Sequence, residues 1–466
     1  MADPVRFDPG SFRDPSGRVF FHRDQVFRTL NEEARCDLEA ARAAGLLPEL
    51  ERRGLLLASE IVTPASCELD AAVAGTHVLR QPRVPLVSYA YEWSFEMLRD
   101  AAVATLEILD RCLAKGFTLK DANSFNVQFV QAAPKLVDVP SIVRYEEGSL
   151  WAGYGQFCRS FLFPLLITAT RGIDFQPLLS GSQGELPAGL AASLMRRRDW
   201  LRPGVLKDVV LQARLERSLS TSAEAVGAST RGARYPKEIL IANVRRLLRI
   251  VRRLKPPRQR STWERYADTT SYNEEEREAK HRFVENALAS ARPARLLDLG
   301  CNTGEYTDLA LAHAKHVIAV DSDARSVDHL YLRHRGRSNV SPLVASIARP
   351  TPPLGWRLAE RRSLAERLHG DFFLALALVH HLRIGDGIPL GALVSHLFEL
   401  APEGIVEWVD KADPMVRKLL GLRPDVFDDY TWERFEALLR QHGTLAAVRE
   451  THGGNRRLCH VKPRSA

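Results

Sequence analysis

A short apolar run that leads into a glycine turn is the feature that most constrains this chain. Arg295–Leu299 reads as a buried strand, the turn Gly300–Gly304 follows it, and a helical stretch opens directly afterwards. Glycine lets a backbone turn tightly and approach a ligand closely. The helix N-terminus beyond the turn offers N–H groups that have no intrahelical partner. The pattern therefore predicts a strand–turn–helix unit with a ligand at the turn.

Two acidic residues narrow the class of ligand. The next apolar run ends at Asp321, where a carboxylate can accept hydrogen bonds from ribose hydroxyls. The turn lacks the middle glycine of the dinucleotide fingerprint G-x-G-x-x-G. Asp298 stands just before the turn, and a carboxylate there suits a cationic ligand better than a diphosphate. The turn therefore does not favour a dinucleotide.

The rest of this half alternates short apolar strands with helical stretches, which predicts an α/β, Rossmann-like domain with a mostly parallel, seven-stranded sheet. The last two strands follow each other without a helix, which predicts a terminal hairpin. The expected strands are Arg295–Leu299, His316–Val320, Val340–Val344, Asp371–Val379, Gly404–Trp408, Leu445–Arg449 and Arg457–Val461. The expected helices are Thr307–Ala314, Ala324–Arg333, Leu390–Leu400, Pro414–Leu420 and Thr431–Gln441.

The run D-L-G-C-N-T-G-E-Y followed by A-V-D resembles the first two motifs of class I S-adenosylmethionine-dependent methyltransferases, and the resemblance covers about Trp263 to Lys462. W-x-x-Y before the turn, A-L-V-H-H-L and the D-P-M segment resemble a bacterial subfamily related to the host-specific nodulation methyltransferases of rhizobia. The resemblance implies S-adenosylmethionine as the cofactor. The alternative is a Rossmann-like turn without methyl chemistry.

The resemblance also implies a role for each residue of the two motifs. The turn would line the methionine part of the cofactor with Asp298 nearby, and Asp321 would hold the ribose hydroxyls. Many members carry an acid beside the adenine after the third strand, where this chain has Ser346, so that contact is weaker or different. The implied cofactor-binding residues are Asp298, Gly300, Cys301, Asn302, Gly304, Asp321 and Ser346.

Two histidines follow the fourth expected strand. Ligands of open α/β sheets bind beyond the carboxyl ends of the strands, so His380 and His381 are expected where a methyl acceptor arrives. Either can remove a proton from the acceptor, because histidine titrates near neutrality. The alternative is that both only shape the loop, and no metal site is expected. Further candidates are Glu407, Asp410, Lys411 and Asp413 on the substrate side, and Trp263, Tyr266, Tyr272 and Lys280 as a lid or a helical cover.

The N-terminal half carries a second pattern. Asp121 and Asn126 have the spacing of the kinase catalytic loop, and Asp138 stands where the metal-binding acid of D-F-G would follow. This half therefore resembles an α+β kinase-like or small-molecule phosphotransferase-like fold. The resemblance implies that Asp121 is the base and that Asn126 and Asp138 bind magnesium.

Several parts of the kinase signature are missing, so a degenerate domain is expected. Leu119-Lys120 replaces the His-Arg of the loop, and Val139-Pro140 replaces the Phe-Gly after the metal acid. The first lysine of the chain is Lys115, so only an arginine such as Arg28 could take the place of the strand lysine that pairs with phosphates, and the two are not equivalent. The alternatives are an active atypical phosphotransferase and an unrelated helical domain.

A basic segment joins the two halves. Arg231–Arg260 contains eleven Lys and Arg and one acid, although the whole chain carries a net charge of only +8. Apolar residues at spacings of three and four predict an amphipathic helix from Pro236 to Leu254. We interpret it as a linker helix with a solvated charged face. Contact with RNA or an anionic membrane is the alternative. The predicted domains are 1–230, 231–260 and 261–466.

The composition excludes other classes. The six cysteines contain no C-x-x-C pair, which argues against a disulfide scaffold or a zinc ribbon. No apolar run approaches the roughly 20 residues that span a bilayer, and the N-terminus lacks a secretory pattern. The sequence therefore predicts a cytoplasmic methyltransferase whose N-terminal half recognises the acceptor or regulates access. A bifunctional phosphotransferase and a non-enzymatic RNA- or membrane-associated adaptor are the alternatives, while the acceptor and the oligomeric state stay open.

Overall fold

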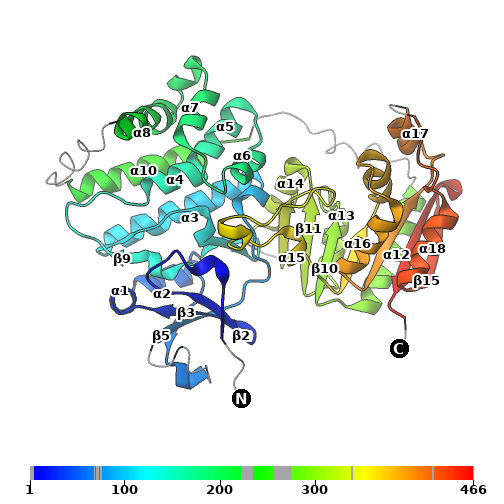
Figure 1. Ribbon diagram of the computed structural model, residues 1–466, viewed down its shortest axis with the longest axis horizontal. Helices are drawn as coiled ribbons and strands as arrows, with labels where there is room; N and C mark the ends of the chain where they lie inside the picture. The colour runs from blue at the N-terminus through cyan, green and yellow to red at the C-terminus, as the bar shows by residue number, and fades with distance from the viewer. Residues whose placement is uncertain are drawn as a thin grey trace. The chain divides into compact units, whose positions relative to one another are not determined.

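The computed structural model describes residues 5–67, 69, 73, 76–221, 235–256, 274–336, 339–421 and 424–464. Contacts divide the chain into two compact units (Figure 1). The N-terminal unit contains residues 1–259 and 353–361, and the C-terminal unit contains residues 260–352 and 362–466. Part of the predicted lid, namely Trp263, Tyr266 and Tyr272, lies outside the described residues.

A seven-stranded sheet forms the centre of the C-terminal unit, in the order β12-β11-β10-β13-β14-β16-β15. The first five strands of this order run parallel, and β16 is antiparallel to both of its neighbours. The expected mixed sheet with a terminal hairpin is therefore confirmed. The strands are β10 (Arg295–Leu299), β11 (His316–Asp321), β12 (Val340–Val344), β13 (Phe372–Ala375), β14 (Glu403–Val409), β15 (Thr444–Thr451) and β16 (Arg456–Lys462).

The central strands are apolar runs because helices cover the sheet. Val317–Val320 of β11 is fully buried, as are Leu296, Leu297 and Leu299 of β10. The connection after β10 leads to β11 on one side, whereas the connection after β12 crosses back to β13 on the other side of β10, which opens a crevice at the carboxyl ends of these strands. The helices are α12 (Glu274–Ala291), α13 (Glu305–Leu311), α14 (Ala324–His334), α15 (Leu364–Arg367), α16 (Leu390–Leu400), α17 (Pro414–Leu420) and α18 (Trp432–His442).

The fourth strand is shorter than its apolar run suggests. β13 ends at Ala375, and Ala377 adopts a positive φ of 50° that ends the extended conformation. A π-helical turn, His381–Gly385, follows. The predicted strand Asp371–Val379 therefore includes a bend, because apolar composition continues past the point where the backbone turns.

The N-terminal unit begins with a five-stranded antiparallel sheet in the order β1-β2-β3-β5-β4. Phe20 and Phe27 stack in its small core, together with Val73 and Val78. The strands are β1 (Arg6–Phe7), β2 (Val19–His22), β3 (Gln25–Leu30), β4 (Glu60–Val62) and β5 (His77–Pro82), and α1 (Glu32–Ala43) and α2 (Leu46–Arg52) lie between β3 and β4 in sequence.

A largely helical region follows. The long helix α3 (Phe95–Ala114) is buried along most of its length, and two short two-stranded sheets come after it. One pairs β6 (Phe117–Leu119) with β9 (Ile142–Arg144), and the other is the hairpin of β7 (Val127–Val130) and β8 (Ala133–Leu136). The remaining helices are α4 (Tyr154–Phe157), α5 (Phe163–Arg171), α6 (Gln176–Gly181), α7 (Ala188–Leu194), α8 (Leu211–Thr221) and α10 (Lys237–Arg253).

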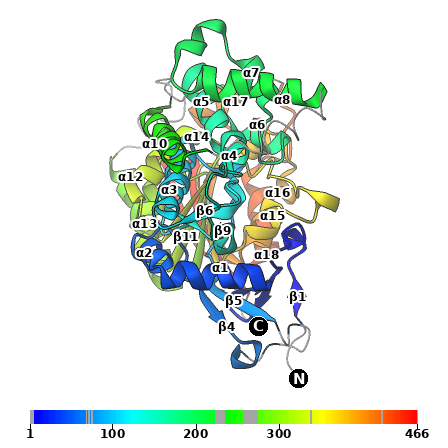
Figure 2. The ribbon, with the colours of Figure 1, turned by 90° about the vertical axis from the view of Figure 1, so that its left-hand side faces the viewer.

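The basic helix α10 packs within the N-terminal unit, alongside α3 (Figure 2). Its apolar stripe, which includes Val244, Leu247 and Val251, is buried. Three of its arginines pair with acids: Arg245 with Asp110 at 2.9 Å, Arg246 with Asp208 at 2.6 Å, and Arg252 with Glu107. Three of the eleven positive charges of the segment are therefore matched by acids of this unit.

A short arm from the second half of the sequence, Pro353–Arg361, belongs by its contacts to the N-terminal unit. Leu354 and Arg361 close it as a bridge. Glu360 accepts hydrogen bonds from Arg13 at 2.6 and 3.0 Å, and the Arg361 guanidinium lies 3.9 Å from the ring centroid of Phe125. The N-terminal unit is therefore built from two separate stretches of sequence.

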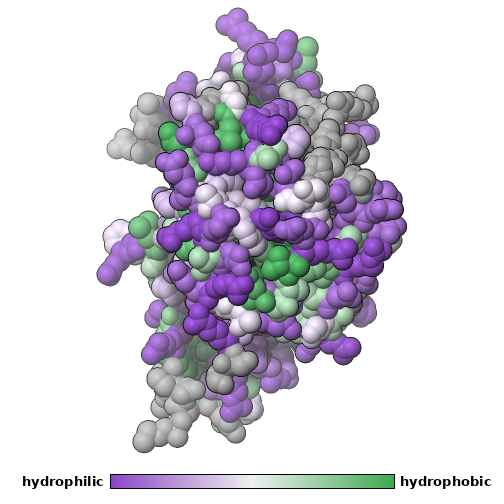
Figure 3. Space-filling model, turned by 90° about the vertical axis from the view of Figure 1, so that its right-hand side faces the viewer, coloured by the Kyte–Doolittle hydropathy of each residue, from purple (hydrophilic) through white to green (hydrophobic). Residues whose placement is uncertain are grey.

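Surface composition shows no long apolar element. None of the described helices has the length and apolar character that crossing a membrane requires. Hydrophilic residues dominate the face in Figure 3 and are interrupted by separate hydrophobic patches. The outer strand β15 carries charged residues such as Arg449 and Glu450, which protect an exposed sheet edge from pairing with another chain.

Candidate functional site

A cavity of about 390 Å³ opens in the C-terminal unit at the carboxyl ends of β10, β11, β12 and β13. Its volume lies in the range of small-molecule and cofactor pockets. The lining residues are Arg277, Lys280, Asp298, Gly300, Cys301, Asn302, Thr303, Glu305, Tyr306, Val320, Asp321, Ser322, Ala345, Ser346, Ile347, Leu376, Ala377, Leu378, His381, Leu382, Gly385, Asp386 and Arg456. The structure thus brings six of the seven expected cofactor-binding residues to one cavity.

The glycine turn is held against the end of β11. The backbone N–H groups of Gly300 and Cys301 both donate to the carbonyl of Val320, at 2.8 and 3.1 Å. Gly300 has a φ of 77° and Asn302 a φ of 48°, and glycine and asparagine are residues that tolerate this left-handed conformation. The turn is thereby fixed between two strands with its backbone toward the cavity.

Gly304 is the exception among the predicted cofactor residues, since it lies outside the lining set. Its φ is 90°, and an added Cβ would clash with Leu330 Cδ1 of α14. Glycine at this position therefore permits the close approach of the turn to Leu330. The residue shapes the start of α13, while Thr303, Glu305 and Tyr306 around it reach the cavity.

Asp298 is a buried carboxylate at the base of the turn. It accepts a hydrogen bond from Thr307 Oγ1 at 2.6 Å. Burial raises the pKa of Asp298 to about 7, and the nearby carboxylates of Asp321 and Asp308 add to the effect while the Thr307 hydrogen bond opposes it. A cation placed in the cavity would stabilise the ionised form. The site is therefore more favourable to a cationic ligand than to an anion.

Asp321 is oriented by the backbone around it. Its two carboxylate oxygens accept hydrogen bonds from Asn302 N and Asp323 N, each at 2.8 Å. Burial raises the pKa of Asp321, and these backbone N–H groups oppose the shift. Ser346 lines the neighbouring part of the cavity, between Ala345 and Ile347. Asp321 can accept further hydrogen bonds from ligand hydroxyl groups through its remaining lone pairs.

The two histidines differ in their surroundings although they are adjacent in sequence. His381 lines the cavity, whereas His380 is fully buried outside the lining set, with the ring centroids 4.1 Å apart. Burial lowers the pKa of His381 to about 4 and lowers that of His380 well below its usual range. Both rings are therefore neutral at neutral pH, and only His381 meets the cavity.

Two cations also line the cavity, namely Lys280, which the sequence analysis named, and Arg456, which it missed. Lys280 donates to Glu407 Oε2 at 2.6 Å, and Arg456 Nε donates to Asp413 Oδ2 at 2.8 Å. The two cations line the cavity while the two carboxylates are buried behind them. No sequence motif marks Arg456, because it reaches this wall only when β16 pairs with β14.

The predicted substrate-side residues therefore lie around the cavity wall and not in its lining. Glu407 and Asp413 hold Lys280 and Arg456 in place. Asp410 accepts a hydrogen bond from Ala412 N, and Lys411 pairs with Asp425 at 2.9 Å. Lys280 is the predicted lid residue that lines the cavity.

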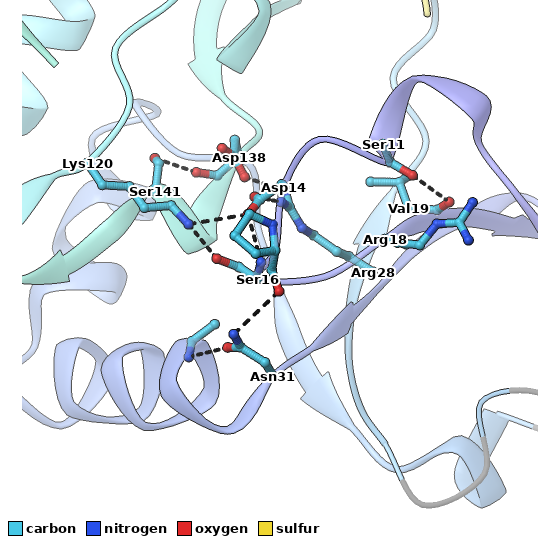
Figure 4. A network of polar contacts seen from close by, with 12 residues as sticks. Ser11, Asp14, Ser16, Arg18, Val19, Arg28, Asn31, Lys120, Asp138 and Ser141 are labelled. Carbon is cyan, nitrogen blue, oxygen red and sulfur yellow. Dashed lines mark hydrogen bonds and ion pairs between the residues drawn. The ribbon is translucent and has the colours of Figure 1, made fainter.

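Asp138, one of the three residues of the predicted kinase-like pattern, belongs to an internal ion network of the N-terminal unit (Figure 4). Arg28 of β3 pairs with both Asp138 and Asp14, and Lys120 Nζ lies 3.4 Å from Asp14 Oδ1. Burial raises the pKa of Asp138, and the Arg28 guanidinium opposes that shift. The carboxylate of Asp138 thus already faces a cation that the chain itself supplies.

The other two kinase-like residues lie close to this network. Asn126 accepts a hydrogen bond from Val137 N through its backbone carbonyl at 2.9 Å, which ties the loop to the segment before Asp138. Asp121 accepts from Gln156 Nε2 at 3.1 Å, and its charge raises the pKa of Asp138. In the part of the chain that the structure describes, no three His, Cys, Asp or Glu side chains are grouped as metal ligands would be.

Known proteins were compared with the chain as a whole and with its structure. No protein-family model matches it. The N-methyltransferase NodS from Bradyrhizobium japonicum WM9 matches with 12% identity and a TM-score of 0.31 over 41% of this chain and 99% of NodS. NodS in complex with S-adenosyl-L-homocysteine matches with 11% identity and a TM-score of 0.31 over 44% and 100% of the two chains. The bifunctional kinase-methyltransferase WbdD matches with 18% identity and a TM-score of 0.29 over 41% and 39%.

A curated relative covers nearly the full sequence. The nodulation protein NoeA of Rhizobium meliloti (strain 1021) is 34% identical over 453 residues, which cover 96% of this chain and 94% of NoeA. The match includes both the glycine-turn half and the kinase-like half, since it leaves so few residues of either chain uncovered. The chain therefore belongs to the family of the nodulation protein NoeA.

Proposed function

We propose that the C-terminal unit is an S-adenosylmethionine-dependent methyltransferase. One observation carries this proposal: a single cavity at the carboxyl ends of the strands is lined by Asp298, the Gly300 turn and Asp321 together. The relative NoeA is a nodulation protein, so we also propose that the methyl acceptor belongs to that process.

The residues around the cavity fit the cofactor. Asp321, with both oxygens oriented by backbone N–H groups, suits a pair of ribose hydroxyls. Ile347 and Leu378 supply apolar surface for a flat base, with Ser346 beside them. Asp298 is a carboxyl group whose ionised form gains from a nearby cation, and the methionine part of the cofactor carries an ammonium and a sulfonium.

When bound, the cofactor supplies a methyl group on a positively charged sulfur. The residues of this chain orient the two reactants, which supplies much of the rate of a transfer between them. Methylation of an O–H or N–H group releases one proton from the acceptor as its new bond to carbon forms. His381 is neutral and lines the cavity, so its ring can take up that proton. His380 supports the loop from behind.

For the N-terminal unit, we propose a kinase-like module that recognises the acceptor or regulates access and transfers no phosphate. The support is the ion pair between Arg28 and Asp138. Asp138 occupies the sequence position of a metal-binding acid, but a guanidinium already compensates its charge. An active phosphotransferase remains the alternative, and binding of ATP–magnesium that is lost in Asp138→Ala would support it.

Calorimetric titration of the full chain with S-adenosylmethionine tests the main proposal, with ATP–magnesium titrated in parallel. We expect the cofactor to bind, the affinity to fall in Asp321→Ala, and ATP–magnesium to give no heat of binding. Asp425→Ala, which removes a carboxylate outside the cavity lining, is the matched control. Binding of ATP–magnesium without binding of the methyl donor would overturn the assignment.

A further inference from the structure

A set of exposed apolar side chains lies on the N-terminal unit, in a segment that contains neither the Asp138 network nor the Asp298 cavity. Five leucines between residues 190 and 215 are solvent-exposed, and Leu201 has a relative exposure of 92%. They lie on α7, on the short helices η8 (Arg197–Leu201) and η9 (Val205–Val210), and on α8, and these elements pack against one another. The leucines are Leu190, Leu201, Leu206, Leu211 and Leu215. Exposed apolar clusters of this kind mark interaction sites more often than isolated exposed residues do.

The backbone aligns three of these leucines. η9 is a π-helical turn that runs directly into α8. A π-helix bonds residues five apart, so it brings Leu206 and Leu211 to similar sides, and Leu215 follows one α-helical turn later. Another side of the same helix, with Val205, Val209 and Ala213, is buried. The result is an amphipathic helix whose second apolar stripe faces solvent.

Exposed basic residues accompany the leucines along the same stretch of the chain. Arg196, Arg197, Arg198, Arg202, Lys207, Arg214 and Arg217 are all exposed in this stretch. Of the acids between residues 196 and 218, Asp199 and Asp208 are buried, and Asp208 is paired with Arg246. Glu216 is the exposed acid of the same stretch. The five leucines and these seven basic residues form what we call the leucine–arginine face, which is strongly positive on its exposed side.

We propose that the leucine–arginine face binds the surface of an anionic phospholipid membrane. Apolar side chains can enter the boundary between headgroups and acyl chains while arginines contact the anionic headgroups. Either signal alone gives marginal binding, and this face supplies both. The chain would then attach from one side of the membrane, consistent with the lack of a spanning helix among the described residues.

Charge and composition favour this partner over two others. A second copy of the chain would bring two positive faces together, and like charges at an interface oppose association. Single-stranded RNA is usually held by aromatic platforms among the basic residues. The aromatic residue in this stretch, Trp200, is half-buried, and the Arg214 guanidinium lies 5.5 Å from its ring centroid.

Cosedimentation of the full chain with vesicles tests the proposal. The probes are vesicles of phosphatidylcholine alone and of phosphatidylcholine mixed with phosphatidylserine. We expect binding to the mixed vesicles, weaker binding at high salt, and little binding to phosphatidylcholine alone. The triple variant Arg197→Gln, Arg202→Gln and Lys207→Gln should bind about 100-fold more weakly, since each basic residue near an anionic surface contributes about fivefold.

A leucine variant tests the apolar part independently. The triple variant Leu201→Ser, Leu211→Ser and Leu215→Ser should weaken vesicle binding at least tenfold. Its thermal unfolding should stay unchanged, because these exposed side chains bury little apolar surface in the folded chain. Leu150→Ser is the matched control, since Leu150 and Leu215 are both 57% exposed. For the charge variant, Arg249→Gln, Arg253→Gln and Lys255→Gln on and beside α10 remove the same number of exposed charges elsewhere.

The outcomes separate the partners. Loss of vesicle binding in both triple variants but not in the controls supports the proposal. Absence of binding to phosphatidylserine vesicles at low salt overturns it, as does equal loss in the control variants. Self-association that the leucine variant abolishes, without vesicle binding, would assign the face to a second copy. Salt-sensitive binding to a single-stranded RNA, again without vesicle binding, would assign it to nucleic acid.

Discussion

Asp298 and Asp321 in the C-terminal unit and Asp138 in the N-terminal unit are all partly or fully withdrawn from water, but they are satisfied in different ways. Asp298 and Asp321 receive hydrogen bonds from a hydroxyl and from backbone N–H groups, and they form no ion pair within the described part of the chain. Asp138 pairs with Arg28, which also holds Asp14. Asp298 and Asp321 line a cavity, whereas Asp138 and Asp14 are paired with Arg28 of the same unit.

The difference shows how a binding site can be told from a structural cluster of the same chemical groups. A buried carboxylate without a cation carries an electrostatic cost that a cationic ligand can relieve. A carboxylate that already faces a guanidinium has part of that cost relieved by the chain itself, although burial still raises the pKa of Asp138. We therefore expect ligand-dependent effects from substitutions in the C-terminal cavity and stability effects from substitutions around Arg28.

The largest effect is expected at His381. His381→Ala should lower turnover about 100-fold or more while the dissociation constant of the cofactor stays within about twofold, because the ring acts on the acceptor proton. Transfer of labelled methyl groups from the cofactor to a metabolite extract measures turnover, and titration measures affinity. His396→Ala on α16 is the control. Equal turnover in both variants would remove His381 from the mechanism.

The pH dependence sharpens the same assignment. The pKa of His381 is lowered to about 4, so the ring stays a proton acceptor well below the usual histidine range. At saturating cofactor, the turnover of the wild type should therefore stay level as the pH falls through 6.5 and should decline only toward about pH 4. A decline centred near the ordinary histidine pKa would mean that another group takes the proton.

A smaller effect is expected at Asp321. Asp321→Ala removes a carboxylate that can bond ribose hydroxyls and that orders the turn through Asn302 N. Loss of hydrogen bonds to a charged group should weaken cofactor binding about 10- to 100-fold. Asp321→Asn keeps one acceptor oxygen and should lie between the variant and the wild type. Titration calorimetry measures all three, and identical affinities would refute the ribose assignment.

Arg28 should behave in the opposite way to the cavity carboxylates. Arg28→Met leaves Asp14 and Asp138 without their shared cation and should lower the free energy of unfolding by about 2 kcal/mol. Adding Asp138→Asn should restore part of that loss. Denaturant midpoints at constant slope give both values, and cofactor affinity should not change. An unchanged free energy of unfolding in Arg28→Met would mean that the ion pairs of Arg28 do not stabilise this region.

Asp298 should show a smaller loss of cofactor affinity than Asp321, with an effect of opposite sign on stability. Asp298→Asn should weaken cofactor binding about tenfold through loss of a negative charge. The pKa of Asp298 is about 7 in the folded chain against an ordinary value of 3.8. The stability linked to its proton is full below about pH 4 and is lost as the pH rises to 7. Asparagine has no carboxyl group to ionise, so Asp298→Asn does not lose this stability as the pH rises.

Thermal unfolding at several pH values checks this sign. Relative to the wild type, Asp298→Asn should gain stability as the pH rises from about 5 to about 8. A loss of stability over that interval would mean that the ionised carboxylate has a stabilising partner in the folded chain.

Local patterns were enough to predict most of the C-terminal fold. Apolar runs, the glycine turn and the acid after β11 are encoded by consecutive residues, and the parallel sheet with its terminal hairpin was predicted from them. The bend after Ala375 was missed, because Leu376 and Leu378 are as apolar as the strand before them. The positive φ of Ala377 does not alter the hydropathy of the sequence, so the apolar pattern could not predict the bend.

The candidate site was predicted only in its cofactor part. Lys280 and Arg456 come from α12 and β16, and only the packing of α12 on β16 and the pairing of β16 with β14 bring them to one cavity. The sequence could not separate His380 from His381, because a single turn of the backbone decides which ring meets the cavity. In the N-terminal half, the absence of an early lysine pointed to Arg28 as its substitute, but not to its pairing with Asp138.

The arm Pro353–Arg361 has a consequence for how the protein is made. Its contacts with Arg13 and Phe125 place it in the N-terminal unit, although β10, β11 and β12 are synthesised before it. Domains tend to fold in order as they leave the ribosome, but this one stays incomplete until residue 361 has emerged. A fragment cut at residue 259 would lack the arm, leaving the Phe125 ring without its guanidinium cover. The two units therefore carry separate candidate sites, but the N-terminal unit is complete only after part of the C-terminal unit has been synthesised.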